Sequence, residues 1–166
     1  MTILLENVGA QKGLLILADE GQLVVEATCN VDEGIIPFRP PIPVQLGKFV
    51  PSAIVRFVSG THENVVIDDA RHDKRFQKDP YIKSSHPKSL LCAPVLRGVA
   101  LSGIIYLENN LLSGVFTPER LEVIRVLTSQ IAISIENAKL YDRVKKAEEK
   151  YRGIFENALE IGRAHV

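Results

Sequence analysis

The sequence predicts an α+β domain with an antiparallel sheet of about five or six strands. We expect helices packed on one face of this sheet and a long C-terminal helix. Three observations support this. Short apolar runs of strand length are separated by turn residues, amphipathic segments lie between them, and a helical pattern fills the C-terminal third. An antiparallel sheet of such strands with helices packed on it is an α+β domain.

The first quarter of the chain predicts a short helix followed by a β-hairpin. Thr2–Val8 is amphipathic, and Gly9 is a plausible helix stop. The apolar runs Gly13–Ala18 and Gln22–Cys29 flank a three-residue turn that contains glycine. Two such runs around such a turn are typical of paired antiparallel strands.

The middle of the chain alternates irregular and regular stretches. Asn30–Lys48 is rich in proline and glycine, which argues against regular structure. Ser52–Ser59 predicts a helix that Ser52 caps and Gly60 ends. Asn64–Ile67 predicts a short strand.

The second half begins with a long polar segment, Ala70–Lys88, for which no element is predicted. Ser89–Leu96 and Leu101–Glu108 then predict two strong strands. The last helix is predicted to begin at Thr117, because threonine caps helices and Pro118 suits the first helical position. Nothing interrupts this helix before Gly153.

The last helix carries two apolar stripes. The first has the spacing of a face that packs on a sheet, and it comprises Leu121, Ile124, Leu127, Ile131, Ile135 and Ala138. The second alternates three- and four-residue steps like a heptad repeat, and it comprises Val123, Val126, Gln130, Ile133, Asn137, Leu140, Val144, Ala147, Tyr151 and Ile154.

The second stripe has two interpretations. It is either a solvated helix surface or the seam of a parallel two-chain coiled coil. We favour the coiled coil, with Ile133, Leu140, Val144, Tyr151 and Ile154 as its apolar seam, because these side chains otherwise face water. Polar residues at two seam positions would weaken the pairing and fix its register.

Composition narrows the classes of function. The 166 residues hold 20 Lys and Arg and 20 Asp and Glu, without a basic patch, so nucleic-acid binding is not predicted. Cys29 and Cys92 lie far apart, which suggests two buried thiols in a reducing compartment. No stretch approaches the length of a membrane span, so we expect a cytoplasmic module without direct membrane contact.

Three segments resemble the GAF domains of large bacterial multi-sensor kinases: Gly9–Leu17, Phe49–Ala70 and Ser89–Tyr141. The most specific portion reads IYLENNLLSGVFTPERLEVI. The resemblance implies a sensor domain over residues 1–141, with a central antiparallel sheet that has helices on one side and a ligand pocket on the other. It also implies a homodimer through terminal helices and control of a distant kinase or similar output domain.

The tail divides into two further parts. Residues 142–160 are interpreted as a signalling helix, and Ala147–Glu160 within them resembles the opening of a PAS domain. This resemblance implies downstream PAS and kinase domains in the parent chain. Residues 161–166 are interpreted as a non-native tail, because Glu160–Val166 matches what a common sequencing adapter encodes in frame.

No cofactor is named by the sequence. Cyclic-nucleotide-binding GAF domains resemble one another in an Asn-Lys…Phe…Asp-Glu motif, which Asn109, Phe116 and Glu119 echo only in part. We interpret Asn109 as shaping its loop and Phe116 as filling the core. Bilin attachment is not predicted because no Cys-His pair occurs, and His62, His72 and His86 are expected to be exposed rather than bound to haem.

Metal binding and catalysis are also not predicted. Asp68, Asp69 and Asp73 form an acidic cluster near His72, which we interpret as turn residues that accept backbone N–H groups rather than as metal ligands. Neither a phosphate loop nor a zinc-protease motif occurs, and neither cysteine lies in a loop where it would act as a reductase thiol. The fragment itself is therefore not expected to be an enzyme, although a kinase parent is.

The pocket implied by the resemblance is expected to be mainly apolar with a few polar groups. Its predicted lining is Phe57, Asp69, Phe76, Tyr81, Ser89 and Cys92. Two functions follow from this fold. The chain is either a module that senses an unknown small molecule and dimerises, within a sensor histidine kinase or multi-sensor kinase, or a ligand-free dimeric spacer between signalling domains.

Overall fold

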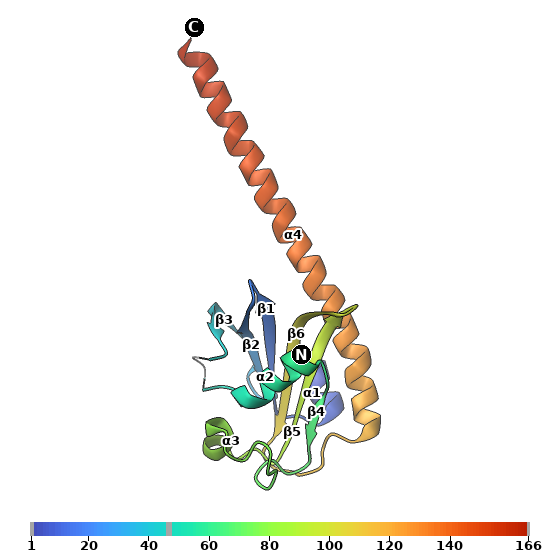
Figure 1. Ribbon diagram of the computed structural model, residues 1–166. Coiled ribbons are helices and arrows are strands. Elements are labelled where there is room, and N and C mark those ends of the chain that lie inside the picture. Colours follow the sequence, from blue (N-terminus) through green and yellow to red (C-terminus); the bar gives the residue numbers. More distant parts are fainter. Residues whose placement is uncertain (1, 46–47, 166) are drawn as a thin grey trace. The chain divides into compact units, whose positions relative to one another are not determined.

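The computed structural model describes residues 2–45 and 48–165, and it divides into two compact units, Met1–Ala132 and Ile133–Val166. The first unit is built on an antiparallel sheet whose strand order is β3-β2-β1-β6-β5-β4 (Figure 1). The strands are β1 (Lys12–Asp19), β2 (Gln22–Asn30), β3 (Gly34–Pro43), β4 (Val65–Ile67), β5 (Ser89–Arg97) and β6 (Ala100–Asn109).

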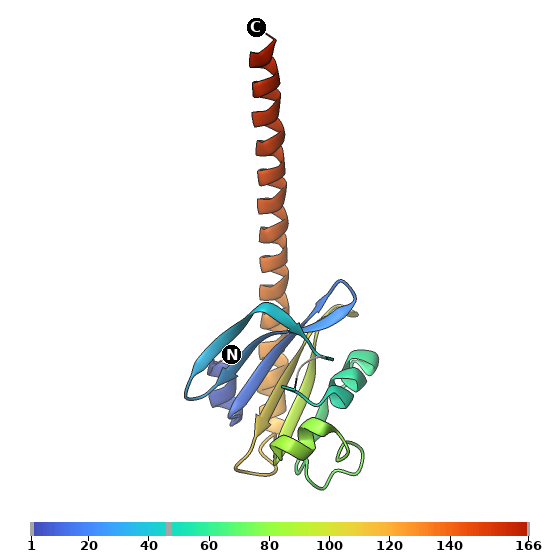
Figure 2. The same ribbon diagram turned by 90° about the vertical axis from the view of Figure 1, so that its left-hand side faces the viewer.

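Helices lie on both faces of this sheet. The helices α2 (Ser52–Thr61) and α3 (Pro80–Ser85) cover one face, whereas α1 (Thr2–Val8) and the first part of α4 (Pro118–Ala164) cover the other (Figures 1 and 2). The α+β class, the sheet of six strands and the long C-terminal helix are therefore confirmed. The sequence predicted helices on one face of the sheet only, whereas α1 and the first part of α4 cover the opposite face.

The main apolar core lies between the sheet and the helix pair α2 and α3. Ile54, Val55 and Val58 of α2 are buried against the central strands, where Leu14 and Ile104 are also fully buried. On the other face, Ile124 of the first stripe of α4 is buried and its neighbours Leu121, Leu127 and Ile131 are half-buried, whereas Ala138, the predicted end of that stripe, is exposed. Thr128 and Ala132, which were not predicted as part of the stripe, are also buried.

Three local predictions were wrong. The segment predicted to be irregular contains β3, because its prolines lie on an edge strand, where a missing N–H breaks no ladder on the open side. The segment Ala70–Lys88 contains α3, a short helix with few apolar residues. Ser52 does not cap α2, which begins after Pro51 and continues past Gly60 to Thr61.

Other local predictions were confirmed. The hairpin of β1 and β2 pairs Lys12 with Asn30 at its open end, and β5 pairs with β6 along its whole length. Gly9 adopts a left-handed backbone with φ of 70° directly after α1. This conformation is easy for glycine, so the residue ends the helix as expected.

Gly103 lies where β6 pairs with β1, so a substitution at this position tests the pairing of these two strands. A Cβ atom at this position would lie 2.5 Å from the Ile16 carbonyl oxygen on β1. We expect Gly103→Ala to lower the free energy of unfolding by about 1–2 kcal/mol, because backbone in a paired strand cannot move aside freely. Gly60→Ala is the control, since open space surrounds a Cβ there and alanine favours a helix. Equal unfolding midpoints for the two variants in urea would contradict the strand pairing.

Candidate functional site

A pocket of about 360 Å³ opens beside α3, on the face of the sheet that α2 and α3 cover. Its walls come from the described residues between β3 and α2, from the start of α2 and from α3 with the residue before it. The lining residues are Val44, Gln45, Lys48, Val50, Ser52, Asp79, Pro80, Tyr81 and Ser84. The pocket therefore combines an apolar surface with a small number of polar groups, which is the usual character of a small-molecule site.

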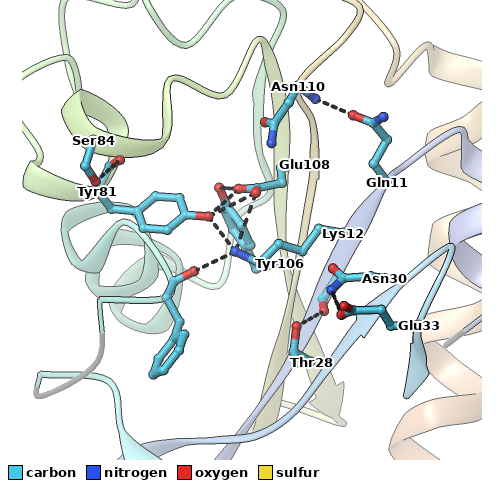
Figure 3. A network of polar contacts seen from close by, with 12 residues as sticks. Gln11, Lys12, Thr28, Asn30, Glu33, Tyr81, Ser84, Tyr106, Glu108 and Asn110 are labelled. Carbon is cyan, nitrogen blue, oxygen red and sulfur yellow. Dashed lines mark hydrogen bonds and ion pairs between the residues drawn. The ribbon is translucent and has the colours of Figure 1, made fainter. Parts of the chain in front are cut away.

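A buried polar cluster lies behind the Tyr81 wall of the pocket. We call Lys12, Tyr81, Tyr106 and Glu108 the Glu108 cluster. The Tyr81 hydroxyl lies 2.8 Å from Glu108 Oε2, and the Tyr106 hydroxyl donates to the same oxygen at 2.7 Å (Figure 3). Lys12 Nζ donates to the Tyr81 hydroxyl at 2.7 Å and lies 3.5 Å from Glu108 Oε1.

The cluster is built by strand register. Lys12 on β1 lies directly opposite Glu108 on β6, so both side chains leave the sheet on the same face. Tyr106 precedes Glu108 by two residues and therefore shares that face. The Tyr81 ring reaches the cluster from α3 and meets the Tyr106 ring edge-on, with centroids 6.2 Å apart.

The surroundings keep both tyrosines protonated. Burial, and next the negative charge of Glu108, raise the pKa of the Tyr81 hydroxyl well above its ordinary value. The same two causes raise the pKa of Tyr106. At neutral pH both hydroxyls are therefore donors, and with Lys12 they surround a carboxylate that is only 1% exposed.

Asp79 joins the N-terminal ends of two helices at the pocket. Its Oδ1 accepts the backbone N–H of Tyr81 in α3 at 2.9 Å, and its Oδ2 accepts the N–H of Ala53 in α2 at 3.1 Å. The side chain is buried, with 7% exposure. One carboxylate thus satisfies a first-turn donor in each helix, which explains why α2 needs no local cap.

Of the six residues predicted to line the pocket, the structure places Tyr81 in its wall. Phe57 is 42% exposed and packs edge-on against Phe76, with ring centroids 6.3 Å apart. Ser89 and Cys92 are fully buried in the sheet. Burial raises the pKa of the Cys92 thiol, so this group is an inert core residue rather than a reactive one.

Asp69, the sixth predicted residue, lies in a surface turn. Its Oδ1 accepts the backbone N–H of Arg71 at 3.1 Å, and Asp73 repeats the pattern with the N–H of Arg75 at 2.8 Å. For Asp69 and Asp73 the interpretation as turn residues is confirmed. Hydrogen bonding from Arg71 holds the pKa of Asp69 well below its usual range.

The partial cyclic-nucleotide motif has a structural role. Asn109 donates to the Gly9 carbonyl at 2.8 Å and accepts the N–H groups of Leu111 and Leu112, each at 2.8 Å. Phe116 is buried, with 3% exposure. Both interpretations made from the sequence, a loop-shaping asparagine and a core phenylalanine, are confirmed.

Apart from Tyr81, the residues that line the pocket were not predicted, and neither were Lys12, Tyr106 and Glu108 of the cluster behind it. Lys12 and Glu108 lie at strand ends, where charged side chains are usually solvated. Their opposite charges on two apolar strands were a usable signal, but only with the pairing of β1 and β6 known. Asp79 directly precedes Pro80, and an Asp-Pro step of this kind indicates a helix start.

The unit Ile133–Val166 is a helical segment with exposed apolar side chains. The five predicted seam residues all lie in it and are exposed to these extents: Ile133 53%, Leu140 45%, Val144 66%, Tyr151 73% and Ile154 56%. No helix among the described residues is both long and apolar enough to cross a membrane.

Comparison with known proteins gives a family match and several relatives. The family model described as "GAF domain" matches residues 1–135. The chain is 39% identical over 94 residues to Hybrid signal transduction histidine kinase G of Dictyostelium discoideum, a match that covers 57% of this chain and 3% of that protein. It is 33% identical over 101 residues to "Probable 3',5'-cyclic phosphodiesterase pde-5" of Caenorhabditis elegans, covering 60% of this chain and 14% of that protein.

The fold also matches solved structures. One is the GAF3 domain of Slr1393 from Synechocystis sp. PCC6803 in its photoproduct state, with a TM-score of 0.63, 12% identity and coverage of 85% of this chain and 91% of that chain. At this identity the likeness concerns the fold alone. The chain spans only a small part of its curated relatives, so their full activities belong to longer proteins.

Proposed function

The chain belongs to the GAF domain family, and we propose that it senses a small molecule and dimerises within a signal-transduction protein. GAF domains are signalling modules that occur in histidine kinases and phosphodiesterases. We propose a sensor histidine kinase or multi-sensor kinase as the parent protein, with PAS and kinase domains downstream. In this proposal the module is cytoplasmic, binds no nucleic acid and makes no direct membrane contact, and the fragment itself is not catalytic.

The observation that carries the sensing proposal is the attachment of the pocket wall to the sheet. Tyr81 lines the pocket, and its hydroxyl is bonded to Glu108 on β6 and to Lys12 on β1. A ligand that moves Tyr81 therefore changes a buried charge cluster between the two central strands. A ligand shifts the populations of two arrangements of Tyr81 only if it binds one of them more tightly than the other. Because Tyr81 both lines the pocket and is bonded to the sheet, its two arrangements would differ in ligand affinity and in the contacts of the cluster.

The seam of α4 supports dimerisation with a second copy of this chain. Its apolar residues continue the three- and four-residue steps over exposed positions, as a coiled-coil partner requires. In a parallel pair Asn137 of each copy lies at the same level, where the two amides can hydrogen-bond and fix the register. We propose this pairing as the route by which the pocket state reaches downstream domains.

Native mass spectrometry of the chain as purified from cells tests both parts of the proposal. A dimer that retains a small-molecule mass supports sensing. A dimer without added mass, even after incubation with concentrated cell metabolites, favours the alternative of a ligand-free spacer. A monomer across micromolar concentrations contradicts dimerisation through α4.

Leu140→Lys is expected to raise the dimer dissociation constant at least tenfold in sedimentation velocity. In a dimer the substitution places one lysine from each copy in the apolar seam, and burying these two like charges costs free energy. Ala138→Lys is the matched control, because it adds the same single charge at an exposed position of α4 outside the seam. If both substitutions weaken the dimer equally, the seam assignment is wrong.

A further inference from the structure

The charges around the pocket indicate the class of its ligand. Two charged side chains, Lys48 and Asp79, line it, and two more, Lys12 and Glu108, lie behind its Tyr81 wall. The formal charges cancel as a set. Their local partners decide which of them is available to a ligand.

Three of these four charged groups already have hydrogen-bond or ion-pair partners. Asp79 accepts one backbone N–H on each oxygen, from the first turns of α2 and α3. Glu108 and Lys12 pair with one another, and Glu108 also accepts hydrogen bonds from two tyrosine hydroxyls. A cationic ligand would therefore meet no carboxylate in the lining that lacks hydrogen-bond donors.

Lys48 is the exception among the four. It is exposed at the pocket rim, and neither a hydrogen bond nor an ion pair joins it to another described residue. Ser52 and Gln45 also line the pocket, and no hydrogen bond joins their side chains to another described residue. These groups offer one positive charge and neutral donors on the same rim.

The rest of the lining is apolar. Val44 and Val50 are buried in the same core cluster as Tyr81. Pro80, the first residue of α3, also lines the pocket. The volume of about 360 Å³ is at the small end for ligand pockets. Resting on the proposed sensing function, we propose that the pocket binds a small monocarboxylate, with its carboxylate against Lys48 and its apolar body against Val44, Val50 and Tyr81.

Matched acid and amide pairs test this assignment. Probes with identical aliphatic or aromatic bodies, such as 4-methylpentanoate with 4-methylpentanamide and phenylacetate with phenylacetamide, are titrated into the whole chain by isothermal calorimetry and ligand-observed NMR. We expect each acid that binds to bind at least tenfold more tightly than its amide. Lys48→Gln should abolish this preference, whereas Lys83→Gln, an exposed lysine of α3 outside the lining, should leave it unchanged.

The outcomes separate the ligand class from the sensing function. If amides bind as tightly as acids, or if Lys48→Gln retains the preference, the carboxylate assignment is overturned while the pocket remains a ligand site. Retention of a neutral or cationic molecule in native mass spectrometry has the same consequence. If no probe binds and no mass is retained, both the ligand class and the sensing function are overturned.

Discussion

Replacing Glu108 with alanine is expected to lower the free energy of unfolding by about 3–5 kcal/mol, the usual effect of removing one partner of a buried charge pair. The carboxylate is 1% exposed, and the Lys12 ammonium lies 3.5 Å from it. Without Glu108 that ammonium loses its counter-charge, and the Tyr106 hydroxyl loses its acceptor in the core. Urea unfolding followed by circular dichroism measures the loss.

Two further variants separate charge from shape. Glu108→Gln keeps one carbonyl acceptor and the volume of the side chain, so we expect a smaller loss than for alanine. Replacing Glu108 with Leu and Lys12 with Met, together with Tyr81→Phe and Tyr106→Phe, removes both charges and the two hydroxyls that donate to the carboxylate. This combined variant is expected to recover much of the loss, because apolar residues often replace a buried pair without cost. A loss below about 1 kcal/mol for Glu108→Ala would show that the cluster does not stabilise the sheet.

Sequence patterns predicted the elements whose signals are local. The runs that became β1, β2, β5 and β6 are apolar and bounded by turns, and a proline at the first helical position marks the start of α4. By contrast, β3 was missed because its prolines are tolerated only at a sheet edge, and edge position is a tertiary property. The short helix α3 was missed for a similar reason, since its start depends on Asp79 more than on an apolar stripe.

The site shows the same division between local and tertiary information. Tyr81 was predicted as a pocket residue, because the fold that the resemblance implies places the Ala70–Lys88 segment in the pocket wall. Lys12 and Glu108 were not predicted, since they lie at opposite ends of the domain sequence and meet only through the pairing of β1 with β6. Buried charge pairs between distant strands are therefore the part of such a site that one sequence reveals least.

Asp79→Ala is expected to lower the free energy of unfolding by about 2–3 kcal/mol, because one side chain caps two helices and each lost cap costs about 1 kcal/mol or more. The loss should be accompanied by faster amide hydrogen exchange at Ala53 and Tyr81, the two N–H groups that the carboxylate accepts.

Asp79→Asn serves as the control, since asparagine caps helices about as well but keeps a single acceptor oxygen. It should therefore retain protection at one of the two amides. Unchanged exchange at both positions in the alanine variant would contradict the double cap.

Because Tyr81 directly follows Pro80 at the start of α3, loss of the cap should also loosen the pocket wall. The same variant is thus expected to weaken any ligand that contacts Tyr81, and this weakening would tie the stability of α3 to occupancy of the pocket.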